Sequence, residues 1–548
     1  MKKYFNNKNL FIFGCVFALI SILSFYFFYV TKNIYHGDDL TFHLSRAEAW
    51  YMALKNGTFF NYANFYTNAQ SGLVLDIFYP FLTYIPIAFL RFLFPSPITC
   101  WYLYWVIVSW LSLMISYYVG KQVFKRNDYA FIFSLFYYFS AYRIYNILIR
   151  AAVGESLAMV FYPLIILGII KLINQEKSAW IPLSLGMTLI AYSHMLSLVL
   201  ATFFLVIIAI FNLKVFLKKD TIIILFKSVT VFLLLSAALI LPMLEQFLYL
   251  NIETTQYKPL LSNSTLNFFE LIYVSLKNTV MSKSLGTLVI TTIIAGPLFY
   301  KKLPTYARQL VIITSGTFIF MSVVDFSLLN DSFLSIIQFV WRLNAILTLL
   351  TSFIFVEILK ILSSYFKYQY VVVTSFLFVI LLGLISYLTI YNYFEENPYN
   401  LPVYNMENYY SHINKVTNKD YLPKEVYANT TDVINNKTVK ASSEKIEYEY
   451  RNESDAIIFI TDASVNGKID TFVVYYKGFK VFKDDKITEF NISNRGTIMF
   501  DVASGKSEYK IIYQLTLVQI MGWLISIVSS LVLLISYIIS KKRERGIL

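Results

Sequence analysis

The sequence has little charge, little glycine or proline, and almost no cysteine. Charged residues make up 14% of the 548 positions, whereas soluble globular chains carry roughly 25%. Counts of 18 Gly, 13 Pro and 2 Cys exclude collagen, low-complexity disorder and a disulfide scaffold. Hydrophobic residues reach 57%, which is more apolar surface than a soluble chain of this length could bury. The composition excludes a soluble enzyme and predicts a polytopic membrane protein in a lipid bilayer.

The two cysteines and the positive charge point to no cofactor and no nucleic acid. Cys15 and Cys100 both lie in apolar segments, and no Cys/His metal pattern occurs. The net charge of +13 is better explained by membrane topology than by nucleic-acid binding. We therefore expect no cofactor and no nucleic-acid partner; the sequence leaves open whether a divalent metal takes part.

Twelve apolar runs have spanning or near-spanning length, since a helix needs about 20 residues to cross the hydrocarbon. The first, residues 11–30, lacks the cleavage site of a signal peptide. The others start near Ile98, Tyr129, Ser156, Trp180, Leu196, Thr221, Gly286, Gln309, Leu343, Tyr370 and Leu515. We expect an all-α polytopic bundle of about twelve transmembrane helices.

Lysine and arginine recur in alternate short loops, which the positive-inside rule assigns to the cytoplasm. With an even number of spans, both termini are then cytoplasmic. The abundance of Lys, Asn, Ile, Tyr and Phe indicates an AT-rich bacterial genome, so we expect the bacterial plasma membrane. The basic loop residues are Lys121, Lys125, Arg126, Lys171, Lys177, Lys214, Lys218, Lys219, Lys301, Lys302, Arg308 and Lys367, followed by the basic tail.

Two long segments are expected outside the cell. Residues 31–97 form the first loop, in which residues 78–94 are apolar but contain Pro80, Pro86 and Arg91. We interpret that stretch as a juxtamembrane or re-entrant helix. Residues 392–513 have the composition of a small β-sandwich, and stretches such as 457–461, 471–476 and 497–501 are predicted strands. The predicted organisation is a transmembrane domain over 1–391, an extracellular β-rich domain over 392–513, and a last helix with a basic tail over 514–548.

The first loop carries an unusual set of polar residues. Asp38 and Asp39 precede a helical pattern, where they suit an N-cap. Asp39, His43, Arg46 and Trp50 then follow at steps of four, three and four, which places them on one helical face. The alternative is capping and a solvated helix face without a catalytic role.

A second polar cluster lies between the third and fourth predicted spans. Arg143, Asn146 and Arg150 recur at helical spacing, and Glu155 follows. Arginine near hydrocarbon is costly unless it is paired or solvated, so the cluster indicates an anion site. The alternative is a purely structural ion pair between Arg150 and Glu155.

Two further residues are predicted on the same side of the membrane. His194 ends the fifth span and Arg342 precedes the tenth; either could be an ordinary interfacial residue. Activated sugars outside the cell are carried on polyprenyl phosphate. Their transfer needs a carboxylate base for the acceptor hydroxyl, cations for the leaving phosphate, and an apolar groove. The clustered carboxylates and arginines meet these needs.

At these residues the sequence resembles the GT-C class of membrane glycosyltransferases, and more narrowly bacterial YfhO-type and 6-pyruvoyl-tetrahydropterin-synthase-related membrane proteins. The likeness covers most of the chain through short motifs. Two positions depart from it, because Val340 and Lys477 stand where proline is usual. The matching stretches are residues 37–46, 78–80, 142–143 with Arg150 and 154–155, 193–194, 338–342 and 475–485.

The resemblance implies a transferase whose catalytic base is Asp39 or Asp38. It would move a sugar from a polyprenyl-phosphate donor to a cell-envelope polymer or lipid with inversion. We expect the donor to be held by His43, Arg46, Arg143, Arg150, Glu155, His194 and Arg342. Two alternatives are a twelve-span carrier or flippase of lipid-linked saccharide, and a non-catalytic cell-envelope assembly protein.

Overall fold

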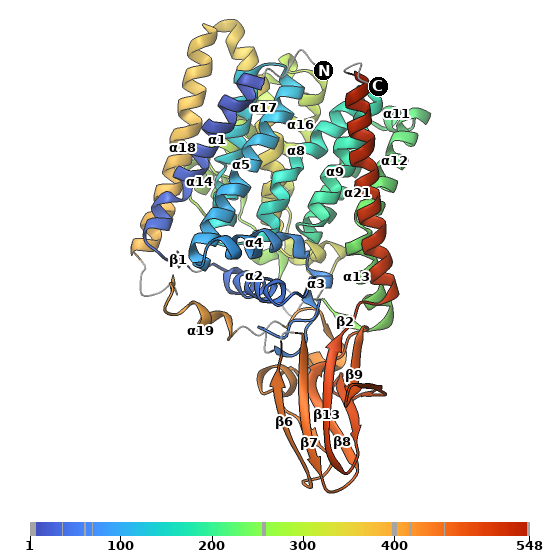
Figure 1. Ribbon diagram of the computed structural model, residues 1–548. Coiled ribbons are helices and arrows are strands. Elements are labelled where there is room, and N and C mark those ends of the chain that lie inside the picture. The colour runs from blue at the N-terminus through green and yellow to red at the C-terminus, as the bar shows by residue number, and fades with distance from the viewer. Residues whose placement is uncertain are drawn as a thin grey trace. The chain divides into compact units, whose positions relative to one another are not determined.

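The computed structural model of the chain is mainly helical with a β-rich region near the C-terminus (Figure 1). It describes residues 7–35, 37–59, 62–67, 70–254, 259–396, 403–415, 419–453 and 455–544. Lys2, Lys3, His36 and Arg545 lie outside these residues. The chain forms two compact units: the first comprises residues 1–40, 96–229 and 258–405, and the second comprises 41–95, 230–257 and 406–548.

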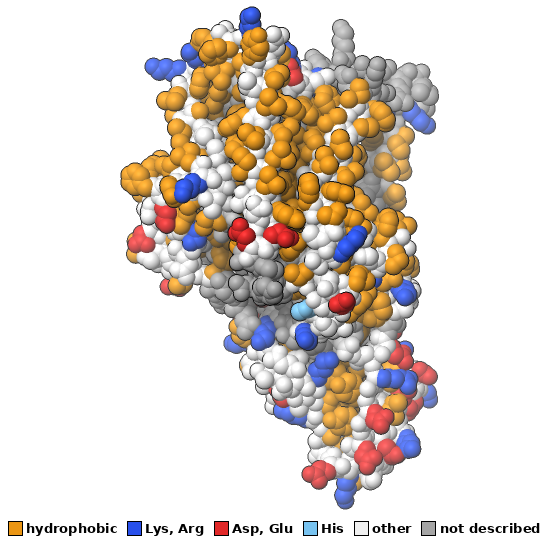
Figure 2. Space-filling model, turned by 90° about the vertical axis from the view of Figure 1, so that its left-hand side faces the viewer, with side chains coloured by type: hydrophobic (Ala, Val, Ile, Leu, Met, Phe, Trp, Pro, Cys, Tyr) orange, Lys and Arg blue, Asp and Glu red, His pale blue; other side chains and the backbone are white. Residues whose placement is uncertain are grey.

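Seven helices among the described residues are long and apolar enough to cross a membrane, or eight if a bent pair counts as one span. On the face in Figure 2, hydrophobic side chains cover much of the helical part, while charged ones gather over the β-rich part. The chain is therefore a membrane protein. The seven are α1 (Asn7–Val30), α5 (Pro97–Phe124), α8 (Val153–Ile173), α16 (Thr305–Val323), α17 (Asn344–Tyr365), α18 (Tyr368–Glu396) and α21 (Leu517–Glu544).

Helices also form at the other five predicted places, but each is shorter than a full span. The α12–α13 pair bends by 74° at its break. Pro297 lies close to the end of α15, and such prolines remove a helical hydrogen bond. The count of twelve spans stays a prediction. These helices are α6 (Asn127–Tyr138), α9 (Trp180–Ala191), α10 (Met195–Phe211), the pair α12 (Lys219–Leu235) and α13 (Ala237–Tyr249), and α15 (Thr287–Phe299).

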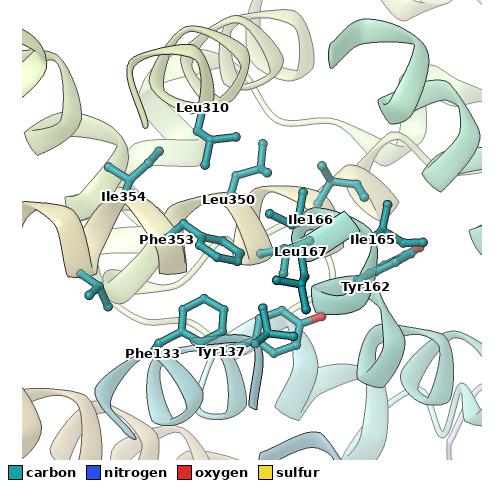
Figure 3. Close-up of a cluster of buried hydrophobic side chains, with 14 of the residues drawn as sticks. Phe133, Tyr137, Tyr162, Ile165, Ile166, Leu167, Leu310, Leu350, Phe353 and Ile354 are labelled. Atoms are coloured by element: carbon teal, nitrogen blue, oxygen red, sulfur yellow. The ribbon is translucent and has the colours of Figure 1, made fainter. Parts of the chain in front are cut away.

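The core of the first unit lies where α6, α8, α16 and α17 meet (Figure 3). Phe133 of α6 packs against Phe353 of α17, with ring centroids 4.5 Å apart and the ring planes tilted by 54°. Gly168 of α8 allows α9 to approach, because a Cβ there would lie 2.5 Å from Leu183. Close packing of this kind holds the helix ends that carry the polar residues of the first unit.

The predicted juxtamembrane stretch is a series of short helices in the second unit. Within residues 78–94 they are η2 (Phe81–Thr83) and α4 (Ile85–Leu93), and α3 (Leu75–Phe78) comes just before them; α2 (Leu40–Lys55), which begins at the unit boundary, is a separate helix earlier in the first loop. Prolines and short turns separate α3, η2 and α4, and none has spanning length.

The β-rich region is a sandwich, as predicted. One sheet has the order β10-β9-β13-β7-β6 and the other β11-β12-β8-β5. Phe459 of β7 packs against Phe472 and Phe500 of the opposite sheet, with centroids 6.3 and 5.9 Å away. The strands are β5 (Lys440–Ala441), β6 (Ile446–Asn452), β7 (Ala456–Ala463), β8 (Gly467–Val474), β9 (Phe479–Lys483), β10 (Lys486–Thr488), β11 (Asn491–Ile492), β12 (Thr497–Val502) and β13 (Gly505–Tyr513).

The turn between β8 and β9 is held by α13, within the second unit. The Gln246 side chain donates to the Lys477 carbonyl at 2.7 Å and accepts from the Lys477 N–H at 3.1 Å. The Lys477 ammonium also lies 3.2 Å from the buried Glu245 carboxylate. A proline at 477 would lack both the N–H and the charge, so lysine has a physical role at this position.

Candidate functional site

The predicted catalytic pair lies in a tight turn before α2, in the first unit. The Leu40 N–H donates to the Gly37 carbonyl at 3.1 Å, and the Asp39 N–H donates to the Arg150 carbonyl at 3.0 Å. Glycine is required at 37, because a Cβ there would lie 2.7 Å from the Ala151 Cβ. The backbone thus ties the aspartate turn to the segment that carries Arg150. Since α2 begins at Leu40, Asp39 precedes the helix and does not lie on its face.

Arg150 lies in the short link between α7 (Ala141–Leu148) and α8. The next residue, Ala151, has a φ of 52°, in the left-handed region that non-glycine residues rarely adopt. The Ala152 N–H donates to the Asn146 carbonyl at 2.9 Å and fixes the turn. The side chains of Asn146 and Arg150, which helical spacing predicts on one face, therefore contact each other at the C-terminal end of α7.

Glu155 is the hub of a buried polar cluster. Arg150 donates through Nη1 to Glu155 Oε2 at 2.9 Å and to Asn146 at 2.8 Å. Tyr142 donates its hydroxyl proton to Glu155 Oε1, and the Asn146 amide donates to the same oxygen at 3.2 Å. The Arg150–Glu155 ion pair considered as a structural alternative is present, but it belongs to a larger network.

Arg342 joins this cluster from the segment before α17. Its Nε lies 3.5 Å from Glu155 Oε2, the same oxygen that Arg150 contacts. Its Nη1 donates to the carbonyl of Ile337 and to Gln338 at 2.9 and 2.7 Å. Within the part of the chain that the structure describes, the buried Nε–H makes no hydrogen bond. Two guanidinium groups thus converge on one carboxylate oxygen.

Asp39 is linked to the cluster through Arg150. Its Oδ2 is 3.8 Å from Arg150 Nη2, beyond hydrogen-bond length, and 45% of its side chain is exposed. Protein atoms around the carboxyl still displace water. This burial raises the pKa of Asp39, while Arg150 opposes the shift and Asp38 reinforces it. A carboxylate with a raised pKa is a stronger proton acceptor.

Arg143 is buried and His194 is partly buried in the first unit. His194 caps α10: its Nδ1 accepts from the Ser197 N–H at 3.3 Å and lies 2.9 Å from the Ser197 hydroxyl. That contact leaves the proton of a neutral imidazole on Nε2. Arg143 donates to Ser109 at 3.3 Å, and its guanidinium lies 4.5 Å from the centre of the Tyr138 ring.

The first-loop residues His43 and Arg46 have their own partners in the second unit. Arg46 is fully buried and donates to Asp76, to the Tyr84 hydroxyl at 3.0 Å and to the Tyr79 carbonyl at 2.8 Å. His43 Nδ1 lies 2.6 Å from the same Tyr84 hydroxyl. This engagement favours a structural role for Arg46.

The comparisons with known proteins give no further assignment. No family model, curated protein or solved structure matches the chain. In the described ranges, no three His, Cys, Asp or Glu residues are grouped to hold a metal ion.

Sequence reasoning missed three members of these networks. Tyr142 supports Glu155, Trp341 lies 4.5 Å from the Arg150 guanidinium, and Asp76 pairs with Arg46. Tyr142 precedes Arg143 and Trp341 precedes Arg342, so adjacency in the sequence to a candidate arginine could have identified both residues. Asp76 lies 30 residues from its partner, and no spacing rule points to it.

Proposed function

We propose that the protein is a membrane glycosyltransferase that takes a sugar from polyprenyl phosphate and transfers it to a cell-envelope acceptor. The observation that carries the proposal is the continuous chain of contacts Asp39–Arg150–Glu155–Arg342. An inverting displacement needs a base on one side of the sugar and cations at the leaving phosphate on the other. Asp39 and Arg342 lie at the two ends of this chain.

In this reaction Asp39 takes the proton of the acceptor hydroxyl while the oxygen of that hydroxyl attacks the sugar C1. The bond from C1 to the phosphate oxygen breaks, and the polyprenyl phosphate leaves with added negative charge. The Arg342 Nε–H and the Arg150 Nη2 group have donors to offer that phosphate. Glu155 then serves to position both guanidinium groups rather than to contact the sugar.

The proposed topology is a GT-C-like arrangement of about twelve spans in a bacterial plasma membrane, with both termini cytoplasmic and the cluster and β-sandwich outside. The alternation of Lys and Arg supports it. In intact cells, a membrane-impermeant thiol reagent should label a cysteine at Lys506 and not one at Lys125, with Cys15 and Cys100 replaced by serine. The reverse result would contradict the proposed site of reaction.

Binding of a short polyprenyl phosphate in lipid nanodiscs tests the arginine cluster directly. We expect binding that polyprenol does not share, and a loss of about tenfold for Arg150→Lys, which keeps the charge but loses the fork. Arg451→Gln, at an exposed ion pair of β6, is the matched control and should bind normally. Equal binding of the phosphate and the alcohol would refute the proposal.

The base is tested separately by transfer from a panel of polyprenyl-phosphate-linked sugars. Asp39→Asn should bind the polyprenyl phosphate normally and lose on the order of 100-fold in transfer rate. Unchanged transfer in a folded Asp39→Asn protein would remove Asp39 from this role.

A further inference from the structure

We propose that Arg143 holds a small monovalent anion of the halide class inside the helical bundle, at a site that does not depend on the proposed transfer reaction. The Arg143 side chain is completely buried. Its Nη2 donates to the Ser109 hydroxyl at 3.3 Å, whereas Nε and Nη1 make no hydrogen bond to the residues that the structure describes. Arginine keeps its proton in proteins, so this buried group stays charged. A charge inside a membrane bundle needs a partner of opposite sign.

No carboxylate in the described part of the chain forms an ion pair with Arg143. Six arginine side chains are buried there, and the other five all have such a pair. The Tyr138 ring, whose centre lies 4.5 Å from the Arg143 guanidinium, attracts the cation but has no net charge. The counter-charge therefore comes from a bound ion. The five pairs are Arg46–Asp76, Arg91–Glu48, Arg150–Glu155, Arg342–Glu155 and Arg495–Asp470.

Helix α5, which Arg143 contacts, offers hydrogen-bond donors along one side. Trp105, Ser109, Ser112 and Ser116 follow one another at steps of four, three and four residues, which places them on one face of the helix. All four side chains are buried. In the described ranges, Trp105 Nε1 and the hydroxyls of Ser112 and Ser116 make no hydrogen bond. Indole and hydroxyl protons next to a guanidinium are the groups that an anion binds.

The Arg143 site is separate from the Glu155 cluster. Tyr142 and Arg143 are neighbours on α7, but Tyr142 donates to Glu155 of α8 whereas Arg143 donates to Ser109 of α5. An ion held by Arg143 would neutralise that arginine and leave Glu155 to its own partners. The expectation that Arg143 helps to hold the sugar donor is thereby replaced by a permanent inorganic ligand.

The charge and burial of the site favour a halide over a phosphate. One guanidinium balances one negative charge, whereas phosphate or sulfate would leave further charge buried without a partner. The Tyr138 ring covers a face of the guanidinium, so a ligand approaches in its plane, where the N–H groups point. The Tyr138 hydroxyl is already bonded to Ser24 at 2.9 Å. A single small ion that accepts from N–H and O–H groups fits these surroundings.

Thermal unfolding in nanodiscs at constant ionic strength tests the site without reference to activity. Sodium chloride or bromide replaces sodium gluconate in steps. We expect either halide to raise the unfolding midpoint by about 2–5 °C, with saturation in the millimolar range. Arg143→Gln should lose this response. Arg451→Gln, at an exposed ion pair of β6, is the matched control and should keep it.

A second variant covers the case in which Arg143→Gln does not fold. Ser112→Ala keeps the guanidinium, and it should need roughly 2- to 10-fold more halide for half of the shift, because one donor to the ion is lost. Ser134→Ala on α6, whose hydroxyl bonds to the Phe131 carbonyl, is its control and should respond as the native protein does.

Three results would overturn the inference. No response of the native protein to halide would mean that water solvates the guanidinium. A midpoint that rises with salt without saturation, or equally in native protein and Arg143→Gln, would mean a general salt effect or an ion bound elsewhere. An unchanged response of Ser112→Ala would remove α5 from the site.

Discussion

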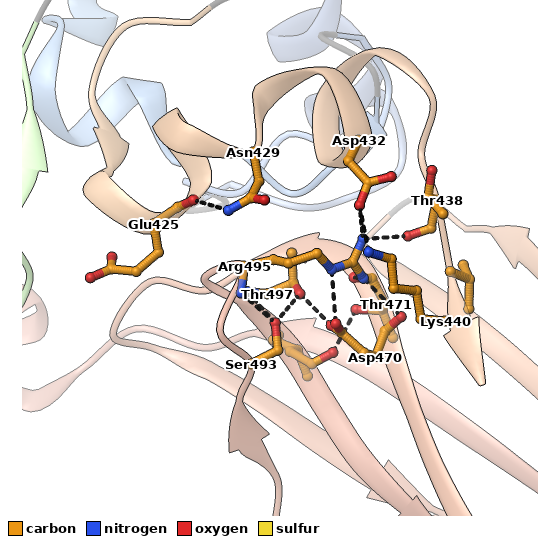
Figure 4. A network of polar contacts seen from close by, with 12 residues as sticks. Glu425, Asn429, Asp432, Thr438, Lys440, Asp470, Thr471, Ser493, Arg495 and Thr497 are labelled. Carbon is orange, nitrogen blue, oxygen red and sulfur yellow. Dashed lines mark hydrogen bonds and ion pairs between the residues drawn. The ribbon is translucent and has the colours of Figure 1, made fainter. Parts of the chain in front are cut away.

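Two buried arginine centres, one in each unit, differ in how completely their charges are satisfied. Arg495 in the β-sandwich donates to the carboxylates of Asp470 and Asp432 and to the backbone carbonyls of Thr438, Asp470 and Thr471 (Figure 4). In the first unit, Arg150 and Arg342 instead share one oxygen of Glu155. A guanidinium whose five donors are all used can only stabilise the fold, whereas one with donors to spare can also receive a ligand.

The saturated centre should give the largest effect on stability. Arg495→Gln leaves the mostly buried Asp470 carboxylate, 14% exposed, without its charged partner, and we expect it to lower the free energy of unfolding by about 3 kcal/mol. The change in unfolding free energy is measured by denaturant unfolding, with susceptibility of the β-sandwich to proteolysis as the readout. Arg451→Gln breaks only exposed ion pairs and should cost about 0–1 kcal/mol. Equal effects of the two substitutions would show that the Arg495 network does not support the fold.

The unsaturated centre should respond to added anion. Glu155→Gln removes the charge that both arginines share, and we expect a stability loss of about 2–3 kcal/mol because glutamine keeps one acceptor oxygen. A polyprenyl phosphate should raise the thermal unfolding midpoint of Glu155→Gln more than that of the native protein, since its charge replaces the lost carboxylate. Asp470→Asn is the matched control and should gain nothing. Equal stabilisation of Glu155→Gln and Asp470→Asn by polyprenyl phosphate would contradict the distinction between the two arginine centres.

The pH dependence of transfer should distinguish the effects of Arg150 and Asp38 on the pKa of Asp39. A base works when deprotonated, so the rate falls as pH drops through the pKa of Asp39, which burial raises above its usual value. Arg150 opposes that rise, and Arg150→Gln should therefore move the acid limb of kcat/KM to higher pH. Asp38 reinforces the rise, so Asp38→Asn should move the limb to lower pH. Shifts of the same sign would exclude Asp39 as the titrating base.

The sequence predicts local structure better than it predicts the lengths of helices. Predicted strands at 457–461 and 497–501 lie inside β7 and β12, because alternation of apolar residues between Gly, Asn and Asp depends on neighbours alone. The apolar run at Thr221 predicts a helix but not the 74° bend that follows α12. Hydropathy does not register where a helix breaks, and the length of a span depends on that.

In the candidate site, too, contacts between residues close in sequence are predicted, whereas contacts between distant residues are not. Asn146, Arg150 and Glu155 meet within ten residues of one another, so helical spacing is enough to group them. Arg342 joins them from nearly 190 residues away, and tertiary packing, including that of α8 with α17, brings it there. Helical spacing groups Arg46 with Asp39, but its contacts are with Asp76 and Tyr84. Long-range pairing of charged residues is decided by tertiary structure, which local patterns do not encode.

The smallest expected effect concerns backbone strain beside the two centres. The residue after Arg495 is Gly496, with a φ of 77°, whereas the residue after Arg150 is Ala151, with a φ of 52°. Left-handed geometry costs a non-glycine residue roughly 1–2 kcal/mol, and glycine avoids this at the expense of a more flexible unfolded chain. Ala151→Gly should therefore stabilise the protein by about 0.5 kcal/mol.

A double-mutant cycle that combines Ala151→Gly with Gly37→Ala tests whether residues 37 and 151 pack against each other. The Cβ introduced by Gly37→Ala would lie 2.7 Å from the Ala151 Cβ, so Gly37→Ala should destabilise the native protein by about 1–3 kcal/mol. The same substitution should be milder when residue 151 is glycine. Rescue should stay partial, because the Ile149 carbonyl and the Ala151 nitrogen remain within 3.0 and 3.2 Å of the new Cβ. Thermal unfolding of the four proteins gives the coupling; additive effects would mean that the aspartate turn is not packed against the Arg150 link.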